Sequence, residues 1–314
     1  MAGRIANPDP YVPGNKESWV GNPVPLFDTG TGYGRHPTTL LVYTHNNRDI
    51  MVIKSDDAGL SWGGEVNITA AARPVGASEL ILATFTGPGG GLQLSATGRL
   101  IVPMIATMSQ DPNCTIYNRA CLSKNARNLV IISDDGGDSW RPGAAAAAIP
   151  GCEAAVANAT IQCGDEFQLA ALPAGGVVGV SRSEPAPWLT WSADGGDTFA
   201  GGWTNASSVL DAGCETSMLG LKDGGPLIIA SPFGTSATRQ NMTISVNVAG
   251  GRGQWAQPLQ LSPSADRHAG YSALGQLGNG EVLCLWETQN QTGACTDSTD
   301  PAGTADLCLG RLRI

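Results

Sequence analysis

The chain has 314 residues, of which 42 are glycine and 20 are proline, and its formal net charge is −9. A nucleic-acid-binding surface needs a basic footprint, so this charge argues against nucleic acid as a partner. Glycine and proline disfavour helix interiors, and no apolar run is long enough to span a bilayer. We therefore expect few helices, no transmembrane segment and one large β domain or two ordinary ones, with no linker between halves.

The first residues are expected to be an N-terminal remnant or linker over 1–20, ahead of a single domain over 21–314. The start of the chain shows no basic segment followed by an apolar stretch, so it predicts no signal peptide.

One phrase recurs along the chain with the frame Ser-x-Asp-x-Gly-x-Ser/Thr-aromatic, at 55–62, 133–140 and 192–199. A fourth, degraded copy over 250–255 keeps a glycine and the aromatic residue. Ser and Asp side chains cap backbone N–H groups and Gly supplies a positive φ, so each phrase predicts a tight turn with its aromatic packed beneath the sheet. Repetition at such intervals is typical of arrays of similar units, which favours a β-propeller over a sandwich.

Short apolar runs between turn signals predict the inner strands of five blades, near 21–75, 78–150, 160–205, 208–262 and 265–314. One hairpin pairs 166–172 with 177–182 and places Glu166 opposite Arg182 at its open end. A second places Tyr271 opposite Glu287. We expect these open ends to gather around the propeller axis, on the face away from the repeated turns.

The eight cysteines include close pairs that disulfides could join, namely Cys114/Cys121, Cys152/Cys163 and Cys295/Cys308. Cys214 and Cys284 lie beside apolar runs and could equally be buried free thiols. N-glycosylation sequons stand at Asn67, Asn113, Asn158, Asn205, Asn241 and Asn290. Together these features predict a secreted protein or one of the secretory or lysosomal pathway.

The repeated phrase resembles the Asp-box of sialidases, and the segments between the copies resemble the successive inner strands of that family. The matching segments are 21–28, Gly87-Pro-Gly-Gly-Gly-Leu-Gln-Leu94, Asp165-Glu-Phe-Gln168, Cys214-Glu-Thr-Ser217, Ala269-Gly-Tyr-Ser-Ala-Leu274 and Cys284-Leu-Trp-Glu287. The resemblance runs in order over about 21–314. It implies an all-β, sialidase-like propeller with five blades recognisable of an expected six.

The resemblance also implies an activity, the release of terminal sialic acid with retention from sialylated glycoproteins, glycolipids or oligosaccharides. In that mechanism Tyr271 is the nucleophile and Glu166 is its partner. Arg182 and Arg239 match two of the three arginines that bind the substrate carboxylate, and Glu287 matches a glutamate that braces the arginines. No cofactor is implied.

The chemistry of these residues supports such a mechanism. Sialic acid carries a carboxylate on its anomeric carbon, so a phenol activated by a glutamate avoids the repulsion that a carboxylate nucleophile would meet. Arginine binds a carboxylate through a planar fork of donors. Read without the resemblance, Tyr271 is more often a packing aromatic and Arg239 a solvated charge, while Glu166 facing Arg182 is as often a structural ion pair. His36, His45 and His268 lack metal-ligand spacing, and the phrases lack the final glutamate of a calcium loop, so no metal is predicted.

The family's first blade, which supplies the first arginine and an acidic aspartate, is not found in the sequence. Only Arg4 and Arg35 faintly resemble its Arg-Ile-Pro motif. Losing one such group typically lowers the rate by about 10²–10⁴-fold, so we expect reduced activity. Two hypotheses remain, an exo-α-sialidase whose sequence begins late and a non-catalytic, sialidase-like propeller that binds glycans or proteins.

Overall fold

The structure, a computed structural model, describes residues 20–30, 36–73, 80–109, 126–151, 163–209, 211–234, 239–256, 258–261, 269–289 and 305–313. Within these ranges the chain is almost entirely β-structure. The exceptions are the four-residue helix α1 (Thr69–Ala72) and two 3₁₀ turns at 173–175 and 222–224. In the described part of the chain no helix is long and apolar enough to cross a bilayer.

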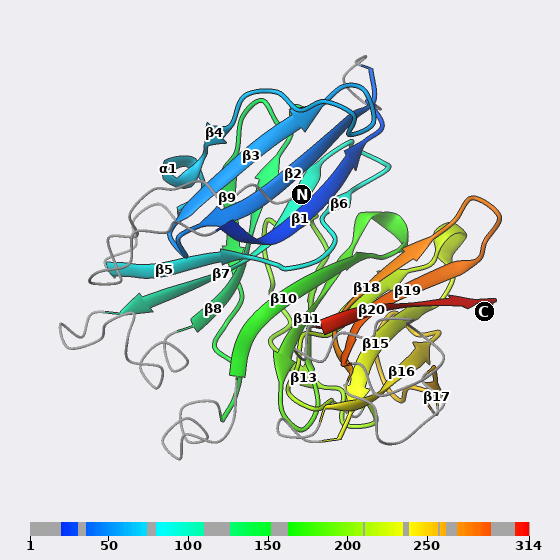
Figure 1. The fold of residues 1–314 in the computed structure, drawn as a ribbon. Helices are drawn as coiled ribbons and strands as arrows, with labels where there is room; N and C mark the ends of the chain where they lie inside the picture. Colours follow the sequence, from blue (N-terminus) through cyan, green and yellow to red (C-terminus); the bar gives the residue numbers. More distant parts are fainter. Residues whose placement is uncertain are drawn as a thin grey trace.

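The strands form five antiparallel sheets that follow one another in an arc, each serving as one blade of a propeller (Figure 1). The first blade contains β1 (Val20–Asp28), β2 (Thr38–His45), β3 (Asp49–Ser55) and β4 (Val66–Asn67). The second contains β5 (Leu80–Thr86), β6 (Leu92–Gln93), β7 (Leu100–Ser109), β8 (Ala126–Ser133) and β9 (Arg141–Ala145). The third contains β10 (Cys163–Ala171), β11 (Val177–Ser183), β12 (Trp188–Ser192) and β13 (Thr204–Asn205). The fourth contains β14 (Ser217–Gly220), β15 (Leu227–Phe233), β16 (Gln240–Asn247) and β17 (Leu259–Gln260), and the fifth contains β18 (Ala269–Gln276), β19 (Val282–Gln289) and β20 (Ala305–Leu312).

This arrangement confirms the predicted all-β propeller and its five blades. The strand order is sequential in each sheet, apart from β6, which pairs only with β7. First strands of neighbouring blades lie side by side, as β14 does with both β10 and β18. The five blades therefore share one central region, toward which their first strands turn.

Each Asp-box forms the turn between the last two strands of its blade, as predicted. In the second blade, Ser133 Oγ accepts a hydrogen bond from the Gly137 N–H at 2.8 Å. Asp135 accepts two more, from the N–H and the hydroxyl at the seventh position of the box, at 2.9 and 2.5 Å. The same three bonds recur in the boxes at 55–62 and 192–199. The side chains thus satisfy the turn's backbone donors, which explains the repeated residue types.

The degraded fourth copy forms a similar turn, although alanine stands at the aspartate position. Asn247 stands where the other copies have serine, and its Oδ1 accepts the N–H groups of Ala249 and Gly251 at 2.8 and 2.9 Å. Gly251 has φ of 85°, close to the 80–90° of the equivalent glycines in the other boxes. An asparagine amide replaces the serine hydroxyl here, which is why the sequence pattern is hard to see.

The aromatic residue that closes each box packs against the preceding blade. Trp140 joins the core between the first and second blades, Phe199 the core between the second and third, and Trp255 the core between the third and fourth. The first box differs, because Trp62 is 41% exposed. The prediction that every box aromatic packs beneath the sheet was therefore wrong for Trp62. Its blade has no preceding neighbour among the described residues.

The two ends of the arc leave apolar sheet surface uncovered. Four core clusters fill the interfaces between successive blades. On the outer side of the first blade Phe27 is exposed, and on the outer side of the fifth Leu285, Leu307 and Leu309 are exposed. In the described structure these two faces lack the packing that every internal blade face has.

For Cys214 and Cys284 the sequence left open a disulfide or a buried free thiol, and the structure shows the free thiol. Cys214 and Cys284 are buried free thiols, and Cys308 is disulfide-bonded. The three expected pairs each include at least one cysteine outside the described residues, namely Cys114, Cys121, Cys152 and Cys295. Their pairing stays a prediction.

The predicted sequons give no further test of the compartment. Asn67, Asn205 and Asn241 lie on strands β4, β13 and β16, while Asn113, Asn158 and Asn290 lie outside the described residues. Localisation stays a prediction, as does the assignment of 1–20 to a linker, because residues 1–19 are not described.

Candidate active site

Irregular pairing at the open ends of the hairpins places the predicted site residues. In the third blade the register shifts between Cys163 and Phe167, so Glu166 lies in an unpaired stretch of β10. In the fifth blade it shifts between Ala269 and Ser272, so Tyr271 lies in a similar stretch of β18. Such bulges re-aim side chains and are common beside active sites.

These two residues meet Arg182 of β11, as the resemblance implied. The Tyr271 hydroxyl donates a hydrogen bond to Glu166 Oε1. Arg182 Nη1 donates to Glu166 Oε2 at 2.6 Å and lies 3.2 Å from the Tyr271 hydroxyl oxygen. Arg182 Nε donates to the Gly213 carbonyl at 2.9 Å, which fixes the guanidinium. Three residues from two blades, separated by up to 105 positions, thus form one cluster.

Burial sets the electrostatics of this cluster. The side chains of Arg182 and Glu166 are only 5% and 11% exposed. Burial raises the pKa of Glu166 above its ordinary value, although the positive charge of Arg182 opposes the shift. Burial also raises the pKa of Tyr271, and the negative charge of Glu166 adds to that rise. The phenol is therefore protonated at neutral pH and hydrogen-bonded to a carboxyl group.

Arg239 lies close to the same cluster, in the segment before β16. Its backbone carbonyl accepts the Ala269 N–H of β18 at 2.9 Å. Burial raises the pKa of the Cys214 thiol to about 12, and the charges of Arg239 and Arg182 both oppose that rise, so both guanidiniums lie near this thiol. Arg239 Nε is buried without a hydrogen-bond partner among the described residues. A guanidinium in this state can bind an anionic group.

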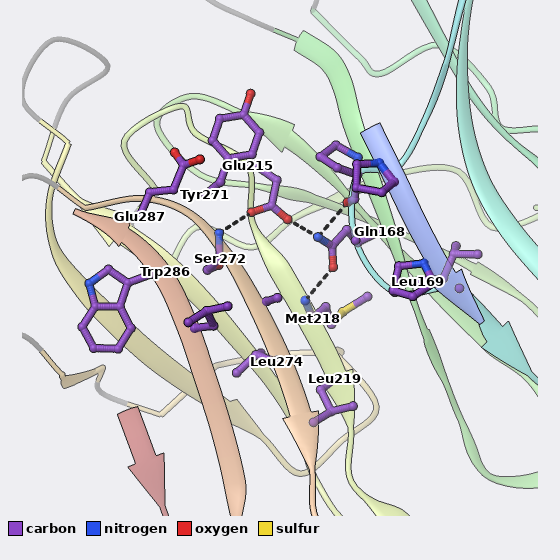
Figure 2. Close-up of a pocket in the computed structure, with 18 of the residues that line it drawn as sticks. Gln168, Leu169, Glu215, Met218, Leu219, Tyr271, Ser272, Leu274, Trp286 and Glu287 are labelled. Carbon is purple, nitrogen blue, oxygen red and sulfur yellow. Dashed lines mark hydrogen bonds between the residues drawn. The ribbon is translucent and has the colours of Figure 1, made fainter. Parts of the chain in front are cut away.

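A cavity of about 480 Å³ lies beside Tyr271 and is lined by residues of all five blades (Figure 2). Its polar lining includes Gln168, Glu215, Tyr271, Ser272 and Glu287. The remaining lining is mostly proline, glycine and leucine, with Met218 and Trp286. Glu287 is half-buried in this wall, and its bracing role toward the arginines stays a prediction. The cavity has the size and mixed lining of a small-molecule site.

Two side chains of this site were missed in the sequence. Glu215 and Gln168 both stand inside motifs that carried the resemblance, but neither was assigned a role. Glu215 is 1% exposed and accepts the Ser272 N–H at 2.9 Å and a hydrogen bond from the Gln168 amide. One available signal was position, because Glu215 lies two residues before β14, much as Glu166 lies near the start of β10.

The two arginines that faintly resembled the missing motif, Arg4 and Arg35, lie outside the described residues. Among the residues that the structure describes, no group of three His, Cys, Asp or Glu side chains is placed to hold a metal ion.

Comparison with known proteins places this geometry in a family. A family model described as "BNR repeat-like domain" matches residues 15–284. Human sialidase-4 is 34% identical over 133 residues, which cover 39% of this chain and 26% of that protein.

Two solved structures share the fold over most of this chain. The Hadza microbial sialidase Hz136 has a TM-score of 0.63 and 21% identity, over 90% of this chain and 53% of that one. The intramolecular trans-sialidase from Ruminococcus gnavus has a TM-score of 0.59 and 20% identity, over 85% of this chain and 50% of that one. The chain thus spans about a quarter of sialidase-4 and about half of the two solved chains. At these identities the structural matches establish the fold. The chain belongs to the BNR repeat-like domain family, with the β-propeller of the sialidases.

Proposed function

We propose that the chain is an exo-α-sialidase-type glycoside hydrolase that releases terminal sialic acid from glycoproteins, glycolipids or oligosaccharides with retention. The single observation that supports this most is the Glu166–Tyr271–Arg182 cluster. A buried carboxylate bonded to a phenol beside a cavity provides a nucleophile and its base, and it suits a substrate that is itself an anion.

In the first step Glu166 takes the phenol proton while the Tyr271 oxygen bonds to the anomeric carbon. The bond from that carbon to the leaving oxygen breaks, and this oxygen departs with the electron pair and takes a proton from solvent. In the second step water attacks the same carbon and loses one proton to solvent, the bond to Tyr271 breaks, and the phenolate recovers its proton from Glu166. Two inversions give net retention. Arg182 and Arg239 would bind the substrate carboxylate.

The fold alone does not select this chemistry, since one propeller supports several functions. The comparisons support it in part, because the matched relatives include human sialidase-4 and a microbial sialidase. The roles of individual residues rest on the geometry of the cluster.

The test is hydrolysis of an aryl sialoside with a fluorescent phenolic leaving group. Such a leaving group departs without acid assistance, so the assay reports on the nucleophile and its base. Turnover by the unmutated chain is expected, with a fall of about 10²–10⁴-fold in Tyr271→Phe and in Glu166→Gln. The acid limb of kcat/KM should lie above the ordinary glutamate value of 4.5, because Glu166 must be ionised and its pKa is raised.

A second candidate is a non-catalytic propeller that binds sialylated glycans or proteins. One observation favours it: exposed Leu285 and Leu307 extend the cavity wall onto the uncovered outer face of the fifth blade. Sialoside binding without turnover by the unmutated, folded chain would select this candidate and contradict the hydrolase.

A further inference from the structure

Glu215 is a buried carboxyl group for which the proposed reaction gives no role. It lies two residues before β14, lines the cavity and points toward β18 (Figure 2). Its Oε2 accepts the backbone N–H of Ser272 at 2.9 Å, and its Oε1 accepts a hydrogen bond from Gln168 Nε2. Both carboxyl oxygens are therefore occupied by N–H donors from neighbouring blades.

Gln168 is itself held at both ends of its amide. Nε2 donates to the Pro88 carbonyl at 2.9 Å, and Oε1 accepts the Met218 N–H at 3.3 Å. These backbone contacts determine which end of the amide faces Glu215. A Cβ at Gly89 would overlap the Gln168 amide, so the surrounding loop leaves the amide no room to turn aside. Glu215 is thus anchored through Gln168 to the second blade.

The hydrogen bond from the Ser272 N–H to Glu215 lies directly after the irregular stretch of β18. Ser272 is the first paired residue after the irregular stretch that contains Tyr271. Side-chain contacts also hold Ser272, since its hydroxyl lies 2.7 Å from that of Ser217. The Glu215 bond acts directly on the peptide group that joins Ser272 to Tyr271. Because bulged residues leave ladder donors unpaired, an outside acceptor determines the conformation of this stretch.

We propose that Glu215 is a positioning residue for Tyr271: by holding the Ser272 N–H from the fourth blade, it fixes the bulge that aims the phenol at Glu166 and Arg182. The inference rests on the proposed role of Tyr271 as nucleophile. It is a geometric role, because Glu215 has no recorded contact with the phenol oxygen.

Burial and the nearby charges act on the pKa of Glu215 in opposing directions. Burial holds its pKa well above the ordinary value, the Ser272 N–H bond opposes this, and the negative charges of Glu166 and Asp211 raise it further. Arg182 is the cation that opposes them. Tyr271 and Glu287 share the cavity wall, from β18 and β19. A glutamine amide at position 215 keeps one oxygen that can accept the Ser272 N–H, but its NH2 group would face the Gln168 Nε2 donor. It should therefore replace the carboxyl group in part, whereas a methyl group should not.

The test compares Glu215→Gln and Glu215→Ala with Asp211→Asn. Asp211 is a matched control, since it is a buried carboxyl of the same segment that bonds to the Cys214 N–H and the Thr216 hydroxyl, but not to β18. With the aryl sialoside, Glu215→Ala should lower kcat by about 10²-fold with little change in KM, as expected for a misplaced reacting group. Glu215→Gln should recover part of this loss, because its amide oxygen can still accept the Ser272 N–H, and Asp211→Asn should retain kcat.

A second measurement reads the position of Tyr271 without requiring turnover. The chain carries five tyrosines, so 3-fluorotyrosine labelling with Tyr271→Phe as reference assigns the ¹⁹F resonance of Tyr271. This resonance should shift or broaden in Glu215→Ala and stay in place in Asp211→Asn, with melting temperatures confirming that each variant is folded.

The two proposals fail separately. No turnover by the unmutated chain contradicts the hydrolase, and the ¹⁹F spectra still decide the role of Glu215. An unchanged Tyr271 resonance in folded Glu215→Ala, or equal kcat losses in the alanine and glutamine variants, would overturn the positioning role.

Discussion

The Asp-box face and the axial site use carboxyl groups in opposite ways. In the first box, bonds from Ser61 and Ser55 lower the pKa of the exposed Asp57 to about 2, from an ordinary 3.8. At the axis, burial raises the pKa of Glu166 and Glu215 and raises that of Asp211 to about 6. In the turns, hydrogen-bond donors lower the carboxyl pKa more than burial raises it. At the axis, burial raises the carboxyl pKa more than the donors lower it. The turns therefore hold permanently charged structural groups, while the axis holds groups that can exchange protons.

The same contrast applies to ion pairs. Arg99 and Arg141 join Asp134 and Asp197 in a partly exposed network between the second and third blades, at 2.6–3.0 Å. Arg182 and Glu166 form a single buried pair. Exposed pairs are screened by solvent and contribute little, whereas a buried charge that loses its partner is strongly destabilising.

The largest expected effect comes from breaking the buried pair. Arg182→Ala should lower the free energy of unfolding by about 3–5 kcal/mol, because it leaves Glu166 buried without its cation. Arg141→Ala is the matched control on the Asp-box face, where about 0–1 kcal/mol is expected. Chemical denaturation of both variants measures the difference. Equal losses of unfolding free energy would show that ion pairs contribute alike on the Asp-box face and at the axial site.

The box aromatics provide a comparison within the Asp-box face itself. Trp140 packs between two blades, so Trp140→Ala should cost about 3–5 kcal/mol of unfolding free energy. Trp62 occupies the same box position in a blade that has no preceding blade in the described part of the chain, and Trp62→Ala should cost about 0.5 kcal/mol or less. Denaturation midpoints compare the two. A large loss in Trp62→Ala would mean that this aromatic is covered in solution.

The carboxyl groups of the two regions should also differ in how they make stability depend on pH. The raised pKa of Asp211 favours the folded state below 3.8, and this contribution is lost as pH rises through about 6. Asp211→Asn should not show this loss of unfolding free energy, which amounts to at most about 3 kcal/mol. Asp57→Asn should change the profile in the other direction, because the lowered pKa of Asp57 stabilises above 3.8 and that contribution disappears as pH falls through about 2. Melting temperatures across this pH range distinguish the variants. If both variants and the unmutated chain gave the same dependence of melting temperature on pH, the opposite pKa shifts of Asp211 and Asp57 would be contradicted.

Local patterns predicted much of this molecule. Serine, aspartate and glycine at fixed offsets predicted the Asp-box turns, because their hydrogen bonds close within eight residues. Strand alternation across short turns placed Glu166 near Arg182 and Tyr271 near Glu287. The irregular pairing that aims these side chains was not predicted, since it depends on contacts between blades.

Contacts between distant segments account for what sequence reasoning missed. The Tyr271–Glu166 bond was expected from the family resemblance, whereas the Glu215–Ser272 bond had no local signal. The exposure of Trp62 likewise depends on which blade lies beside it. Burial and partners of this kind follow from how the blades are arranged around the axis.

The most direct test of the proposed site is covalent trapping with a sialosyl fluoride that carries a second fluorine beside the anomeric carbon. Fluoride leaves readily, while the second fluorine slows hydrolysis of the intermediate by destabilising the positively charged transition state. Mass spectrometry of the digested chain should find the sugar attached to Tyr271 and no adduct in Tyr271→Phe. Attachment to another residue, or none in a folded chain that turns over the aryl sialoside, would contradict Tyr271 as the nucleophile.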